Sequence, residues 1–118
     1  MTASDQRFRP REHLRLRADF ARAFASNCRR GDDLLVAYIA PNGLKWSRLG
    51  LSVSKRLGNA VRRNYLRRKI REAFRLHRSD LPTGLDIVCI ARRGALRANA
   101  DLARSLCTLV RKAASGVA

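Results

Sequence analysis

The stretch that decides the fold runs from Gly58 to Phe74 and reads GNAVRRNYLRRKIREAF. Its apolar residues recur at helical spacing and predict a helix over residues 61–76 with one buried stripe. The stripe comprises Val61, Leu66, Ile70, Ala73 and Phe74. Asn59 is a suitable N-cap for this helix, because its side-chain oxygen can accept a hydrogen bond from a backbone N–H of the first turn. The remaining elements are interpreted around this helix.

The same part of the chain is strongly basic. Ten of the 26 Lys and Arg residues lie between Lys55 and Arg78. Arg63, Arg67 and Arg71 recur every four residues and therefore share one face, which Asn64, Arg68 and Arg75 flank. Like charges at this spacing destabilise an isolated helix, so the ridge is best explained as a surface for phosphates. The alternative is a solvated charged face, but such faces usually mix both signs.

Length and net charge limit the possible functions. A chain of 118 residues with a formal charge of +17 is one domain that repels itself unless it has a polyanionic partner. That partner is a nucleic acid or, as the alternative, an anionic membrane surface. No apolar run approaches the roughly 18 residues of a membrane span, and no secretory signal is visible, so we expect a cytoplasmic protein. We predict a single domain over residues 1–118, with flexible tails at 1–11 and 115–118.

The rest of the chain predicts a small sheet with helices packed on it. The predicted elements are a helix over residues 14–25, strands over 34–39, 49–54 and 87–91, and a last helix capped by Asn99 or Asp101. We expect the first two strands to form an antiparallel hairpin, and the nearly all-apolar third strand to be buried on both faces. This order predicts an α+β sandwich.

No residue pattern points to catalysis by the chain itself. His13 and His77 lie near no nucleophile or carboxylate pair in any motif, and Cys28, Cys89 and Cys107 are too widely spaced for a zinc or redox motif. The carboxylates form no cluster of the kind that two-metal nucleases use. We therefore assign no catalytic residue and no metal ligand.

The quoted segment resembles the signature helix of the bacterial ribonuclease P protein family. It has the GNAV start, an Arg-Asn pair, basic pairs and the IREAF ending. The strand residues 49–55, the Asp19-Phe20 to Phe24 pattern and residues 86–92 resemble further family motifs, so the likeness spans roughly residues 12–112. One position departs: where the family has Arg-Asn-Arg, this chain has Arg63-Asn64-Tyr65. We assign Tyr65 no phosphate contact; its ring could instead stack on a base.

The resemblance implies a specific fold and a division of labour. The family fold is an α-β-β-β-α-β-α sandwich, which requires one more strand, near Cys28–Arg30, and a left-handed β-α-β crossover. Periodicity would not predict that crossover, because about 98% of such connections are right-handed. The family also implies that catalysis occurs in a partner RNA, assisted by Mg²⁺ bound to that RNA. The chain would then bind this ribonuclease P RNA and precursor tRNA, and no DNA or membrane.

Two sets of residues follow from the resemblance. The partner RNA would be bound by Lys55, Arg56, Asn59, Arg62, Arg63, Asn64, Arg67, Arg68 and Arg71. The single-stranded 5′ leader of precursor tRNA would lie in a cleft at Phe20, Phe24 and Tyr38, because aromatic rings stack on unpaired bases. Without the resemblance, ordinary core packing would be the preferred interpretation of the two phenylalanines. With it, we expect at least one of them to be partly exposed.

Two other classes of protein remain as alternatives. The composition also suits a structural RNA-binding protein, such as a ribosomal protein. A DNA-binding regulator would place the basic helix in a major groove, but such proteins usually pair two helices closely before the groove. Here the strand over 49–54 leads directly into the basic helix.

Overall fold

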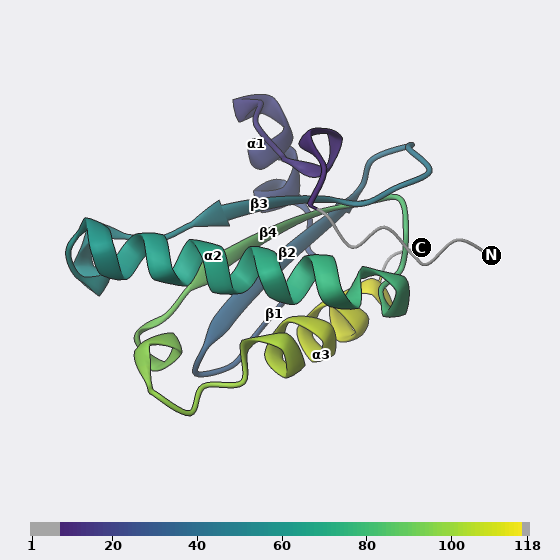
Figure 1. Ribbon diagram of the computed structural model, residues 1–118. Coiled ribbons are helices and arrows are strands. Elements are labelled where there is room, and N and C mark those ends of the chain that lie inside the picture. The colour runs from purple at the N-terminus through teal and green to yellow at the C-terminus, as the bar shows by residue number, and fades with distance from the viewer. Residues whose placement is uncertain (1–7, 117–118) are drawn as a thin grey trace.

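The computed structural model describes residues 8–116, which form a four-stranded sheet with helices on both faces (Figure 1). The elements are α1 (Arg17–Ala25), β1 (Arg29–Gly31), β2 (Leu35–Pro41), β3 (Arg48–Ser52), α2 (Ala60–His77), β4 (Leu85–Ala91) and α3 (Leu102–Ala114). Short 3-10 turns lie at Pro10–Glu12, Lys55–Leu57, Arg78–Asp80 and Arg93–Leu96. The predicted sandwich is confirmed, and β1 is the additional strand that the resemblance implied. Within the described residues, no helix combines the length and apolarity that crossing a membrane requires.

The strand order corrects one prediction. The sheet runs β1-β2-β4-β3, with β2 antiparallel and β3 parallel to β4. The expected hairpin between residues 34–39 and 49–54 is therefore wrong, because β4 lies between these two strands. Strands that follow each other in sequence often pair, which favoured the hairpin. The apolar β4 instead takes an interior position in the sheet, where both of its faces are covered and both of its edges are hydrogen-bonded. The predicted burial of residues 87–91 on both faces is confirmed, except at Ile90, which is half-buried.

The connection from β3 to β4 is left-handed. In Figure 1, β3 runs from right to left, α2 crosses in front of the sheet from left to right, and β4 returns below β3 in the direction of β3. The left-handed crossover that the resemblance implied is therefore present, although most crossovers of this kind are right-handed. It places the full length of α2 along one face of the sheet.

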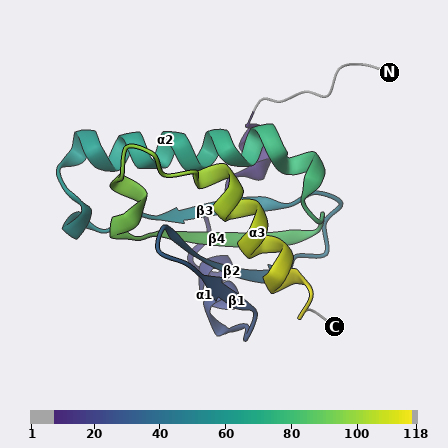
Figure 2. The same cartoon turned by 90° about the horizontal axis from the view of Figure 1, so that it is seen from below.

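The sheet separates two apolar cores. Helices α2 and α3 cover one face and α1 covers the other (Figure 2). The larger core lies under α2 and α3, and it includes Leu35, Ile39, Ile70, Phe74 and Leu106. The smaller core consists of Leu14, Ala23, Ala40 and Val88, with Phe20 and Tyr38 packed partly against it. Alternating side chains of β2 thus serve both cores, as expected for a central strand.

Local signals explain how α2 is placed. Asn59 is the N-cap, as predicted: its Oδ1 accepts a hydrogen bond from the backbone N of Arg62 at 3.0 Å. Gly58 before it has a φ of 131°, a conformation that side chains disfavour. The buried stripe is confirmed except at Val61, which is 76% exposed. Val61 precedes Leu66 by five residues, which is about 140° around the helix and turns it away from the sheet.

The N-terminal segment packs against the end of α2. The ring of Phe8 lies 4.1 Å from that of His13 and 5.7 Å from that of Phe74, measured between centroids. The buried Glu12 accepts hydrogen bonds from the backbone N of Arg9 and from Arg78. Packed structure therefore begins within the predicted N-terminal tail. Residues 1–7 of that tail, and 117–118 of the C-terminal one, lie outside the described residues.

Candidate nucleic-acid interface

Three arginines form a ridge along one flank of α2. This basic ridge comprises Arg63, Arg67 and Arg71, all half-buried. The Asn64 Oδ1 accepts a hydrogen bond from Arg67 Nη1 at 2.9 Å. Within residues 8–116, the ridge forms no ion pair with any carboxylate, and neither do the exposed Arg62 and Arg68. Arg63 Nε is buried and has no hydrogen-bond partner there. These five arginines therefore present positive charge that no ion pair within residues 8–116 offsets.

The turn before α2 extends this positive surface. Lys55 and Arg56 lie in the 3-10 turn that follows β3, and both are exposed. The first backbone N–H groups of α2 point toward the same end, where the helix dipole adds partial positive charge. A Cβ on Gly58 would lie 2.8 Å from Arg62 Cδ, so glycine allows this turn to approach the helix closely. All nine residues assigned from the sequence to the partner RNA thus lie on α2 and its preceding turn.

His13 lies near the C-terminal end of the basic ridge, in a partly buried position. Burial lowers the pKa of the His13 imidazole below its ordinary value of 6.5, and the charges of Arg15 and Arg71 lower it further. Glu12 acts in the opposite direction with a smaller effect. Arg71, the last residue of the basic ridge, therefore lies close enough to His13 for its charge to act on the imidazole.

The predicted aromatic residues lie together on the opposite face of the sheet. Phe24 and Tyr38 contact each other edge to face, with ring centroids 5.0 Å apart and an interplanar angle of 80°. Phe24 is 43% exposed, whereas Phe20 and Tyr38 are half-buried. The expectation that one phenylalanine is partly exposed is confirmed. Phe20 lies on β3 because Gly50 has no side chain: a Cβ there would be 2.6 Å from Phe20 Cζ.

An arginine beside this aromatic group was not predicted from the sequence. Arg29 of β1 pairs in register with Tyr38 of β2, and its Cζ lies 5.6 Å from the centroid of the Tyr38 ring. The exposed guanidinium therefore adds positive charge to the edge of the aromatic group. The pairing of Arg29 with Tyr38 could not be predicted, because β1 is only three residues long and its register cannot be read from the sequence.

A buried carboxylate that the sequence analysis missed holds α1 against the sheet. Asp86 in β4 is fully buried and accepts hydrogen bonds from Arg48 Nε and Nη2 at 2.8 and 2.7 Å. It also accepts from Arg22 of α1 and, at 3.0 Å, from Asn42 Nδ2. An acidic residue inside an otherwise apolar strand is the signal that could have identified it. The network fixes the helix that carries Phe20 and Phe24.

These features define a small basic α+β protein with two distinct surfaces: a cationic helix on one face and an aromatic group on the other. The chain belongs to the ribonuclease P protein family, because the family model described as Ribonuclease P matches residues 8–114.

Curated relatives and solved structures agree with this assignment. The chain is 43% identical over 86 residues to the ribonuclease P protein component of Thermotoga maritima, covering 73% of this chain and 74% of that one. It is 40% identical over 106 residues to that of Desulfosudis oleivorans, covering 89% and 88%. Its fold is similar to the ribonuclease P protein structures from Staphylococcus aureus and Thermotoga maritima, each with a TM-score of 0.75 and 35% identity. The alignments cover 85% of this chain and 93% and 96% of those chains.

Proposed function

We propose that this chain is the protein subunit of a ribonuclease P ribonucleoprotein, which binds the catalytic RNA and the 5′ leader of precursor tRNA and so assists 5′ maturation of tRNA. The observation that carries this proposal is the set of arginines on α2 that have no carboxylate partner. Arg62, Arg68 and the basic ridge form no ion pair within the described residues. In a family of RNA–protein enzymes, such charge is best used against RNA phosphates.

The geometry of α2 suits structured RNA. Arginine presents a planar fork of donors that matches phosphate oxygens, and the ridge repeats this fork along more than two helical turns. The exposed turn at Lys55 and Arg56 adds contacts at the helix N-terminus, where backbone N–H groups also attract phosphate. We assign this continuous surface to the catalytic RNA.

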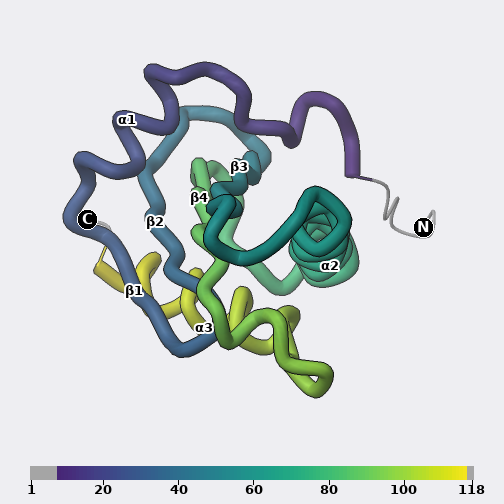
Figure 3. The backbone as a smooth tube through the Cα atoms, turned by 90° about the vertical axis from the view of Figure 1, so that its left-hand side faces the viewer, coloured from purple at the N-terminus to yellow at the C-terminus, as the bar shows by residue number. Residues whose placement is uncertain are grey.

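The aromatic group suits an unpaired leader. Phe24 and Tyr38 offer rings on which bases without a pairing partner can stack, and Arg29 offers charge for the adjacent phosphates. Tyr38 packs against the smaller core under α1, and Phe24 of α1 contacts its ring. Helix α1 lies on the opposite side of the sheet from α2 (Figure 3). One RNA would therefore be bound on each side of the domain.

We place the hydrolytic chemistry in the RNA. Within residues 8–116, no three His, Cys, Asp or Glu side chains gather in a way that could hold a metal ion. The described part of the chain thus offers no site that fits Mg²⁺, and we assign these ions to the RNA. The contribution of the protein is to bind and orient both RNAs.

Reconstitution tests this proposal. The chain is mixed with a bacterial ribonuclease P RNA, and cleavage of a leader-bearing precursor tRNA is measured at low Mg²⁺ concentration. We expect the protein to accelerate cleavage at the mature 5′ end. Tight RNA binding without acceleration would favour a structural RNA-binding protein instead, and preferential binding of duplex DNA would favour a regulator.

A further inference from the structure

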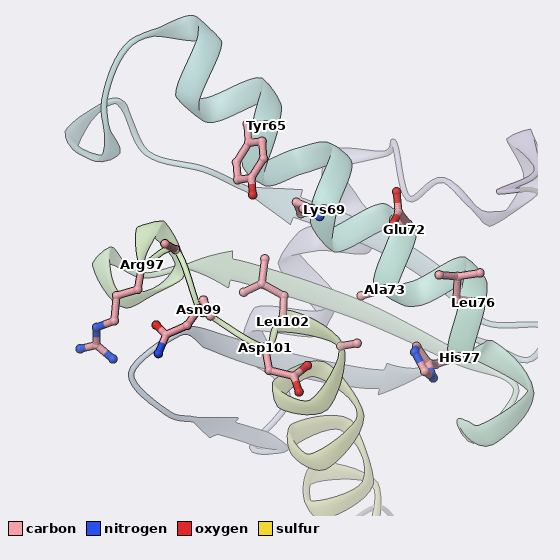
Figure 4. A pocket seen from close by; sticks show the side chains of 13 residues that line it. Tyr65, Lys69, Glu72, Ala73, Leu76, His77, Arg97, Asn99, Asp101 and Leu102 are labelled. Carbon is pink, nitrogen blue, oxygen red and sulfur yellow. The ribbon is translucent and has the colours of Figure 1, made fainter.

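A pocket beside α2 is not used by the proposed function. It has a volume of about 400 Å³ and lies between α2 and the connection that leads into α3 (Figure 4). Its size is near the lower end of small-ligand sites. Tyr65, Lys69 and Leu76 line it from α2, and Asn99 and Leu102 line it from the connection and α3.

The pocket has an aromatic wall with cations beside it. Tyr65 is 46% exposed, and its ring points from α2 toward the connection, where Leu102 points back at it (Figure 4). Arg68 Cζ and Lys69 Nζ each lie 5.8 Å from the centroid of the Tyr65 ring. An exposed ring next to positive charge is the arrangement that binds a nucleotide, with the base on the ring and its phosphate near the cations.

The polar lining favours a base over a phosphate inside the pocket. Glu72 and Asp101 line it, and their negative charges oppose entry of a phosphate. Asn99 is exposed, and within the described residues its side-chain amide has no hydrogen-bond partner. In Figure 4 this amide points away from Tyr65, so the Tyr65 ring is the surface that a base in the pocket would contact.

We propose that this pocket binds one unpaired nucleobase of the partner RNA, which stacks on Tyr65. This proposal rests on the proposed function, since it gives the RNA-binding helix a second kind of contact. Positive charge at the rim favours RNA over a partner protein, because Lys69 and Arg97 of the lining and the adjacent Arg68 suit phosphates that flank the base.

The salt dependence of RNA binding separates this contact from the phosphate contacts. Tyr65→Ala should weaken binding to ribonuclease P RNA about 5- to 150-fold, which corresponds to roughly 1–3 kcal/mol for one stacked base. The slope of log affinity against log salt should not change, since no phosphate contact is lost. Tyr65→Phe is the matched control and should keep most of the affinity, because the ring remains. Asn99→Ala is a second control and should keep the affinity, because the Asn99 amide points away from Tyr65 (Figure 4).

Ultraviolet crosslinking followed by mass spectrometry gives the second measurement. We expect a nucleotide adduct on Tyr65, mapping to a base that is unpaired in the free RNA. Unchanged affinity for Tyr65→Ala, or no adduct on Tyr65, would overturn the proposal and would leave the pocket to another occupant. An equal loss in Tyr65→Phe would also overturn it, since stacking would not be the cause.

The outcomes distinguish this proposal from the proposed function. If the unaltered protein binds the RNA with a steep salt dependence and Tyr65→Ala binds equally well, only the pocket assignment fails. If the unaltered protein shows no salt-dependent binding, the proposed function itself fails. Folding is checked by the thermal midpoint, which should be unchanged in all three variants because Tyr65 and Asn99 are exposed.

Discussion

Removal of two ridge arginines should weaken RNA binding and flatten its salt dependence. The perturbation is Arg67→Ala combined with Arg71→Ala. Neither side chain forms an ion pair within residues 8–116, so no carboxylate loses a partner. Alanine favours the helix, and removing like charges four residues apart relieves repulsion, so α2 should remain folded.

The magnitude follows from the number of cations on this surface. Seven Lys and Arg residues are assigned to the partner RNA, in the turn at residues 55–56 and on α2. If each meets one phosphate, log affinity should fall with log salt with a slope of about −6.3, and affinity should drop about 6,000-fold between 50 and 200 mM salt. With two contacts removed, the slope should be about −4.5 and the drop about 500-fold.

Equilibrium binding of a bacterial ribonuclease P RNA across this salt range gives both slopes. The matched control is Arg104→Ala with Lys112→Ala, which removes the same charge from exposed positions on α3. The control should keep the slope of the unaltered protein. Equal slopes for the ridge variant and the unaltered protein, or equal losses in the ridge and control variants, would refute the assignment of the ridge to RNA.

Three further predictions concern catalysis, stability and pH. Purified protein without RNA should not cleave precursor tRNA; metal-dependent cleavage that a single carboxylate substitution abolishes would contradict this. Asp86→Ala should lower the free energy of unfolding by about 3 kcal/mol in urea denaturation, near the lower end for a buried pair because Arg22 and Arg48 can reach water. An unchanged denaturation midpoint would show that the network is not stabilising. Because folding lowers the pKa of His13, its protonation favours the unfolded state, and this residue's contribution to stability should decline as pH falls below about 6.5. RNA binding at Arg71 should raise the pKa of His13 in an NMR titration, and an unchanged pKa would place the RNA elsewhere.

Local signals made α2 predictable from the sequence. The cap at Asn59, the stripe from Leu66 to Phe74 and the ridge arginines depend on contacts within one helix. Helical periodicity therefore fixes which residues share a face before any tertiary structure is known. Val61 was wrongly assigned to the core, because its spacing of five residues from Leu66 already turns it about 140° away from the buried face.

Non-local contacts explain what could not be predicted. The insertion of β4 between β2 and β3 depends on pairing across more than thirty residues, and the alternation of apolar residues does not reveal which strand is the neighbour. The Asp86 network is of the same kind, since it joins α1, β3 and β4. The pairing of Arg29 with Tyr38 likewise required the register of β1.

The central claim is that the two faces of the domain bind different RNAs, and Tyr38→Ala tests it most directly. Tyr38 is half-buried, so its loss should disturb the core less than that of a buried residue, and circular dichroism verifies folding. The measurement is the affinity of the reconstituted holoenzyme for precursor tRNA with a leader of several nucleotides and for leaderless tRNA. We predict weaker binding of the leader-bearing substrate alone, with unchanged affinity of the variant for the catalytic RNA. An equal effect on both substrates, or a loss of catalytic-RNA affinity as large as that of the Arg67 and Arg71 variant, would contradict the claim.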